Sequence, residues 1–232
     1  TVYDEWCLSV IANALKNKEE AKYFSERSLN YRKVFNPETK FFHPKDTLGV
    51  FMPNLDYRFP PGIGGRDAYD ENTGYVYRFD VPHNVGDLVQ LIGGKQAFTD
   101  ALEDMYSTPL GKGRPDFYHI YVDHTGNVGQ FSMGNEPAMH VPYLYNYAGQ
   151  PWRSQNRVRS LLNQWYRNDL MGIPGDEDGG GLTSFIVFSQ LGFYPITPGL
   201  PMYVIGSPTF QNATLVLGNG KTFSIVCQNY SP

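Results

Sequence analysis

The chain has 232 residues, of which 41% are hydrophobic and 18% are charged, with a net charge of −4. This composition excludes a disordered chain and predicts one large globular core. No run of Lys and Arg could neutralise a phosphate backbone, and no stretch reaches the roughly 20 apolar residues of a membrane span, so we expect neither nucleic-acid binding nor a transmembrane helix. Cys7 and Cys227 are too few for a disulfide scaffold. Aromatic residues make up 15% of the chain, which suits the binding of sugar rings as well as the filling of a core.

The N-terminal third predicts two helices. Apolar residues from Tyr3 to Ala14 recur with helical spacing and would share one buried face. A second helix is expected from Lys18 to about Val34, ended by the Asn36-Pro37 pair. Residues 38–70 are rich in Gly, Pro, Phe and Asp without helical period, which predicts a long irregular segment.

Helical spacing returns in the middle of the chain, where Gly93-Gly94 is typical of the end of a helix. Residues 107–137 have no such period and predict a second irregular segment. The helices expected from this pattern cover Val85–Ile92, Gln96–Tyr106, Val141–Tyr147, Ser154–Tyr166 and Thr183–Leu191.

The C-terminal segment predicts strands. Short β-branched runs cover residues 203–205, 213–217 and 222–227, and Gly218-Asn219-Gly220 indicates a hairpin between the last two. Because strands and helices do not alternate, a parallel doubly wound sheet is excluded. We therefore predict a mainly α fold: paired helices that form part of a toroid, with a site at one mouth and short strands at the C-terminus.

Acidic residues of the irregular segments are the best candidates for chemistry. Glu71 opens an aromatic stretch, Glu136 lies in Gly134-Asn135-Glu136-Pro137, and Asp176 and Asp178 belong to the turn GDEDGGG. Glycosidic cleavage needs a protonated carboxyl in an apolar surround and an ionised carboxylate that activates water or attacks carbon. Glu71 fits the first role, and the Asp176/Asp178 pair fits the second because the flanking glycines let the backbone approach a ligand. A plain surface turn remains open for GDEDGGG.

Two further interpretations follow from the same segments. Asn135, Glu136 and loop carbonyls offer the hard oxygen ligands that Ca²⁺ accepts, although no EF-hand spacing is present. His83 and His140 are near these acids in sequence and are expected either to contact substrate or to be structural histidines.

At these motifs the chain resembles the catalytic domain of glycoside hydrolase family 92, the calcium-dependent, inverting exo-α-mannosidases. The resemblance spans nearly the whole chain. Its strongest segments are GNEPAMHVPYLYNYAGQPW (134–152), GIPGDEDGGGLTSFIVFSQLGFYPITPG (172–199) and YVIGSPTF (203–210), with support from VPHNVGDLVQLIGGKQAF (81–98) and VYDEWCLSVIANAL (2–15).

The resemblance implies roles for individual residues. The general acid of the family opens an E-G-x-A-W-Q-Y motif, twelve residues before the histidine of a Pro-His pair, and Glu71 stands twelve residues before His83. The general base belongs to a G-N-[DE]-D segment, which matches residues 175–178 and implies Asp178 first and Asp176 second. Glu136 is implied as a ligand of Ca²⁺, an ion that would bind mannose hydroxyls. Tyr75, His83 and Asn135 are the expected substrate contacts.

The chain also departs from the family pattern. Tyr75 and Val76 stand where the acid motif has Trp and Gln, and Ala138-Met139 stands where members often have Ser-His. These changes affect the sugar subsites. They keep open a second interpretation, a non-catalytic mannose-binding or scaffolding subunit, and a third, an (α/α)6 glycosidase that acts on glucosides.

The resemblance further implies an organisation in domains. Residues 1–200 would form part of an (α/α)6 barrel, and residues 201–232 would be strands leading back to a β-sandwich that is otherwise absent. We expect the missing N-terminal segment, or a partner chain of the same enzyme, to complete the barrel. The expected substrate is a mannose-containing glycan, and the expected location is secreted or periplasmic.

Overall fold

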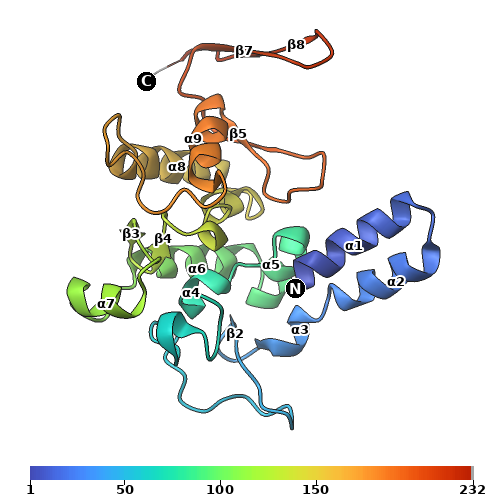
Figure 1. Ribbon diagram of the computed structural model, residues 1–232, viewed down its shortest axis with the longest axis vertical. Coiled ribbons are helices and arrows are strands. Elements are labelled where there is room, and N and C mark those ends of the chain that lie inside the picture. The colour runs from blue at the N-terminus through green and yellow to red at the C-terminus, as the bar shows by residue number, and fades with distance from the viewer. Residues whose placement is uncertain (231–232) are drawn as a thin grey trace.

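The structure, a computed structural model, describes residues 1–230 and is mainly helical (Figure 1). This confirms the mainly α fold with short strands at the C-terminus. The longer helices are α1 (Val2–Ala14), α2 (Lys18–Arg27), α5 (Val85–Ile92), α6 (Lys95–Ser107), α8 (Pro151–Trp165) and α9 (Gly181–Leu191). Shorter ones are α3 (Tyr31–Val34), α4 (Gly74–Tyr77) and α7 (Arg114–Ile120), with 3-10 turns η1 (Ile63–Gly65), η2 (Pro82–Asn84), η3 (Glu136–Ala138) and η4 (Val141–Asn146).

The first helical pair differs from the prediction in two ways. The helix expected from Lys18 to Val34 is broken into α2 and α3, because the Ser28 hydroxyl donates to the Ser25 carbonyl and a turn follows. The face of α1 expected to be buried is partly exposed: Ile11 is 55% exposed, whereas Ala12 is buried. Helix α1 packs on α2, and its buried residues are the small Ser9 and Ala12, whereas Leu8, Val10 and Ile11 are exposed.

Helices α5 and α6, both expected from the helical spacing, contribute many side chains to the hydrophobic core. They pack as a hairpin, and Gly93 ends α5 with a positive φ of 120° that suits glycine. The side chains that fill the core from these two helices are Val85, Leu88, Val89, Ile92, Phe98, Leu102 and Met105.

The segment after α6 is more ordered than expected. It contains α7, and strands β3 (Asn127–Val128) and β4 (Phe131–Ser132) pair in antiparallel fashion. The helix expected at Val141–Tyr147 is the 3-10 turn η4, in which Pro142 has no N–H to donate. These turns fix the backbone on both sides of Glu136.

The C-terminal part follows the prediction closely. Strands β7 (Asn212–Val216) and β8 (Thr222–Val226) form the expected hairpin, which projects beyond the helices (Figure 1). Strand β6 (Val204–Ile205) pairs with β5 (Phe193–Tyr194), and near the N-terminus β1 (Phe35–Asn36) pairs with β2 (Phe41–Phe42). Residues 231–232 of the range expected to lead to a β-sandwich lie outside the described residues.

The structure also bears on membrane-spanning helices and on the two cysteines. Within residues 1–230, no helix combines the length and the apolar character needed to cross a bilayer. Cys7 and Cys227 are both free thiols, and each is half-buried.

Candidate functional site

A cavity of about 380 Å³ brings together acidic residues from separate segments of the chain. Glu71 precedes α4, Asp80 lies between α4 and η2, and Glu136 begins η3. All three line the cavity, together with His140 and with apolar residues that include Met139, Tyr194 and Ile196. The fold therefore joins two of the predicted acids, Glu71 and Glu136, across 65 positions of sequence.

Glu71 is half-buried, and its environment favours the protonated acid. Burial raises the pKa of its carboxyl, and the negative charges of Glu136 and then Asp70 raise it further, while hydrogen bonding by the Asn135 side chain opposes the shift. Its backbone N–H donates to the hydroxyl of Tyr77 at 3.3 Å, and the Tyr77 ring stacks on Tyr69 with centroids 5.6 Å apart. The aromatic stretch seen in the sequence thus supplies the apolar surround that an acid catalyst needs.

The GDEDGGG turn lies against the Gly134–Pro137 segment. A Cβ at Gly175 would be 2.6 Å from the carbonyl oxygen of Gly134, and a Cβ at Gly181 would be 3.5 Å from Cγ of Glu136. Because only glycine allows this approach at Gly175, the start of the turn lies against Gly134, and its end at Gly181 lies beside Glu136.

The three acids of that turn differ in their contacts. Glu177 accepts hydrogen bonds from the backbone N–H and the hydroxyl of Thr183, 3.2 and 2.5 Å away, at the start of α9. Asp176 and Asp178 are exposed. Asp178 also has a φ of +48°, a left-handed conformation that is costly for a residue with a Cβ. Strained backbone of this kind clusters at functional sites.

Two of the expected substrate contacts lie elsewhere. Tyr75 packs on Phe41 with centroids 5.1 Å apart and joins the margin of the core. The His83 ring lies 6.1 Å from the Tyr3 ring and 6.3 Å from the Trp6 ring, and its Nε2 lies 3.1 Å from the carbonyl oxygen of Ser28. Neither side chain lines the acidic cavity. Asn135, the third expected contact, is buried, accepts a hydrogen bond from Asn72 and does not line the cavity either.

Asp80 is a cavity residue that the sequence did not indicate. It stands between Phe79 and Val81, both fully buried, whereas Asp80 itself is exposed and lines the cavity. In the sequence, Asp80 is a single acid between two apolar residues, and the same pattern is common in ordinary strands, so it did not indicate a site.

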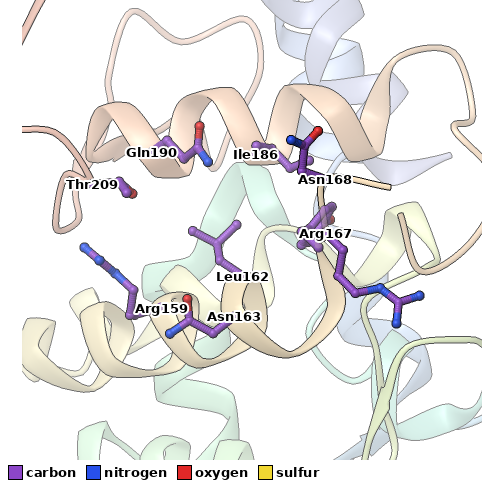
Figure 2. Close-up of a pocket in the computed structure, with 9 residues that line it drawn as sticks. Arg159, Leu162, Asn163, Arg167, Asn168, Ile186, Gln190 and Thr209 are labelled. Atoms are coloured by element: carbon purple, nitrogen blue, oxygen red, sulfur yellow. The ribbon is translucent and has the colours of Figure 1, made fainter. Parts of the chain in front are cut away.

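The described residues hold a larger cavity that lacks these acids. It has a volume of about 570 Å³ and lies between α8 and α9, with Arg159 and Leu162 on one wall and Ile186 and Gln190 on the other (Figure 2). No carboxylate lines it. The smaller acidic cavity is therefore the candidate site for acid–base chemistry.

The whole chain, residues 1–232, matches the glycosyl hydrolase family 92 catalytic domain. A solved family GH92 α-mannosidase from Bacteroides thetaiotaomicron in complex with mannoimidazole is 30% identical with a TM-score of 0.89, over 99% of this chain and 30% of that one. A family GH92 inverting mannosidase from the same species is also 30% identical, with a TM-score of 0.81, over 99% of this chain and 31% of that one.

A curated relative is similar over the same range. It is an uncharacterized secreted glycosidase of Arthroderma benhamiae, 29% identical over 98% of this chain and 29% of its own length. The chain thus spans about 30% of the length of the relatives that it matches.

Proposed function

Because the chain belongs to glycosyl hydrolase family 92, we propose that it supplies catalytic residues of an inverting exo-α-mannosidase. Two of the solved structures that it resembles are named as an α-mannosidase and an inverting mannosidase. The observation that carries the proposal is the acidic cavity, in which Glu71 and Glu136 meet and the pKa of Glu71 is raised. The substrate would be a glycan with terminal α-mannose.

Glu71 would act as the general acid. A carboxyl that stays protonated near neutral pH can donate its proton to the glycosidic oxygen as the bond to the sugar breaks. Burial and the adjacent charge of Glu136 both favour that protonated form.

Asp178, helped by Asp176, would act as the general base. Both carboxylates are exposed, as a group that must take a proton from water requires. Their neighbour Glu177 is bound to Thr183, which leaves these two for chemistry. Inversion by single displacement places the acid and base carboxyl groups about 6.5–9.5 Å apart, with the water between base and sugar.

Calcium fits the residues around Glu136. The donors there are the hard oxygens of a carboxylate and of backbone carbonyls. Thr125 Oγ1 is buried without a hydrogen-bond partner and lies against Gly134, where a Cβ would be 2.2 Å away. Within residues 1–230, no three His, Cys, Asp or Glu side chains converge to hold a metal by themselves. Glu136 would therefore bind the ion with backbone oxygens, and the ion would polarise sugar hydroxyls when bound.

We further infer how this part belongs to the complete protein. Residues 1–200 would form part of an (α/α)6 toroid, and residues 201–232 would lead to a β-sandwich formed by another segment. The uncovered apolar side chains of α1, such as Ile11 and Leu15, support a missing helical neighbour. A secreted or periplasmic location is favoured because the curated relative is named as secreted.

Glu71→Gln in the complete protein tests the acid. We expect the rate on mannobiose to fall by about 10²–10⁴-fold. The rate on dinitrophenyl α-mannoside should fall much less, because that leaving group departs without a proton. Asp178→Asn should slow both substrates. Asp70→Asn, beside Glu71, is the control and should keep activity within a few-fold.

The product tests the mechanism. Proton NMR should detect β-mannose as the first anomer released, and a chelator should remove activity that added Ca²⁺ restores. The first release of α-mannose would contradict inversion. Mannose binding without hydrolysis would favour the sugar-binding subunit, and cleavage of aryl glucosides alone would favour the glucosidase.

A further inference from the structure

A buried pair of side-chain amides joins the segments that carry Glu71 and Glu136. Asn72 follows Glu71, and Asn135 precedes Glu136. Nδ2 of Asn72 donates to Oδ1 of Asn135 at 3.0 Å, and the two residues are only 0% and 1% exposed. A hydrogen bond between fully buried amides is shielded from competing water.

The direction of this bond is fixed by the backbone. Oδ1 of Asn72 accepts from the N–H of Thr73 at 2.7 Å, so the NH₂ end of Asn72 must face Asn135. Oδ1 of Asn135 is then the accepting end, and its NH₂ end is the one left to donate. Hydrogen bonding by the Asn135 side chain lowers the pKa of the Glu71 carboxyl, against the burial that raises it. Hydrogen bonds of fixed polarity therefore run from the Thr73 backbone through Asn72 to Asn135, which stands beside Glu136.

We propose that Asn72 is a positioning residue for the reaction, because it clamps Asn135 in the orientation that holds Glu71 beside Glu136. This inference rests on the proposed function. The E-G-x-A-W-Q-Y motif that this segment resembles has glycine at the position of Asn72, and glycine carries no amide. The clamp, meaning the hydrogen bond from Asn72 to Asn135, is thus a feature of this chain that the family motif does not supply. Asn72 does not line the cavity, so its effect passes through Asn135.

Asn72→Asp in the complete protein is the sharpest test. It keeps the shape of the side chain and the bond from Thr73 N–H, but it replaces the donation to Asn135 with a carboxylate oxygen that faces Oδ1 of Asn135, so the contact becomes repulsive. We expect kcat on mannobiose to fall about tenfold or more, with KM changed by less than about twofold, because misplacing a catalytic group raises the barrier without weakening ground-state binding. Asn72→Ala should show the same division between kcat and KM.

The matched control is Asn146→Asp. Nδ2 of Asn146 donates to the carbonyl of Tyr143 at 2.8 Å and to the hydroxyl of Ser154 at 3.0 Å, away from the acidic cavity. The same chemical change there should lower the melting temperature and leave kcat unaltered. If both variants melt earlier and both keep kcat, Asn72 is merely structural and the proposal is overturned.

A second measurement separates this proposal from the proposed function. Thermal melting of Asn72→Ala, Asn135→Ala and the double variant should be non-additive, with the double variant shifted no further than the larger single one. Additive shifts would show that the two amides act independently and would refute the clamp. A complete protein that cleaves no mannoside would refute the function, and the melting result would still decide on the clamp.

Discussion

Burial decides the protonation of single side chains in this chain as much as residue type does. Glu71 has a raised carboxyl pKa because it is half-buried. His124 is fully buried, with Nε2 2.9 Å from the Gln130 carbonyl oxygen and Nδ1 without a partner, and burial lowers its pKa to about 4. The sequence indicates Glu71 through its aromatic neighbours, but it gives no sign that His124 is buried and neutral.

His124 makes stability depend on pH. Its unfolded imidazole takes up a proton near pH 6.5, whereas the folded one stays neutral until about pH 4. The unfolded state therefore binds more protons in this window, and stability is lost as the pH falls. We expect the free energy of unfolding to drop by about 1–2 kcal/mol between pH 7 and pH 5 from this group.

Urea unfolding of His124→Gln checks this expectation. Glutamine can still donate to the Gln130 carbonyl but does not titrate. The variant should therefore lose less stability than the parent between pH 7 and pH 5. Equal losses would mean that His124 is protonated in the folded protein.

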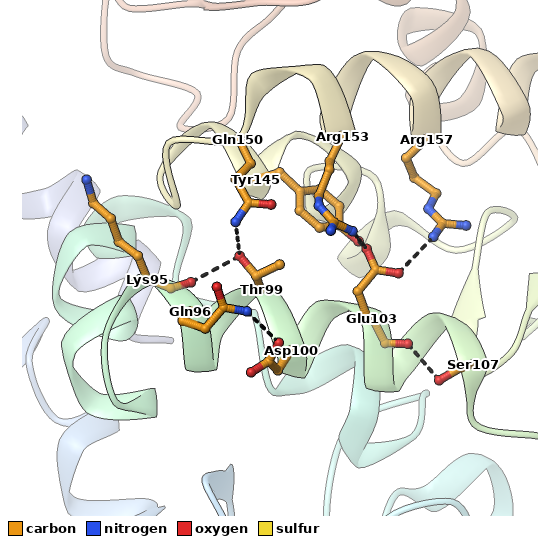
Figure 3. A network of polar contacts seen from close by, with 10 residues as sticks. All are labelled: Lys95, Gln96, Thr99, Asp100, Glu103, Ser107, Tyr145, Gln150, Arg153 and Arg157. Atoms are coloured by element: carbon orange, nitrogen blue, oxygen red, sulfur yellow. Dashed lines mark hydrogen bonds and ion pairs between the residues drawn. The ribbon is translucent and has the colours of Figure 1, made fainter.

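At the scale of elements, networks of hydrogen bonds and ion pairs stabilise contacts between helices that hydrophobic packing brings together. Glu103 on α6 accepts from the hydroxyl of Tyr145 at 2.8 Å and from Arg153 on α8 at 2.9 Å, and it pairs with Arg157 at 3.5 Å (Figure 3). The period of each helix was visible in the sequence. The sequence did not show that one acid of α6 faces two arginines of α8, because this contact depends on how the two helices pack together.

Glu103→Gln should loosen the contact between α6 and α8. The Glu103 side chain is 41% exposed, so solvent weakens the ion pairs, and we expect a loss of about 1 kcal/mol in the free energy of unfolding. Asp100→Asn is the control on the same helix, since exposed Asp100 accepts from Gln96 within α6. If Glu103→Gln lowered the free energy of unfolding no more than Asp100→Asn does, Glu103 would not stabilise the contact between α6 and α8.

At the scale of the whole molecule, apolar surface remains uncovered on α1. Leu8, Ile11 and Leu15 are 43%, 55% and 76% exposed. The spacing in the sequence predicted one buried apolar face from Tyr3 to Ala14, but the buried residues of α1 are Ser9 and Ala12. The sequence pattern cannot say which neighbour buries a face.

We expect that face to be buried in the complete protein. Ile11→Asn should then lower its melting temperature, because a polar amide would replace a packed side chain, at a cost of about 2–4 kcal/mol. Residues 1–232 alone should melt at nearly the same temperature with or without the change. If Ile11→Asn changed the melting temperature of the complete protein and of residues 1–232 by the same amount, no other segment would cover α1.

Most of the longer helices, the C-terminal hairpin and the family could be predicted from local patterns, because periodicity, glycine placement and ordered motifs are local properties. Its spacing placed α5, α6, α8 and α9 within a few residues of their observed bounds. The tertiary structure alone decided which side chains meet: it joined Glu71 to Glu136, added Asp80, and turned Tyr75 and His83 into packing residues. The reason is that a side chain's direction depends on the neighbours packed around it, which are distant in sequence and leave no mark on the local pattern.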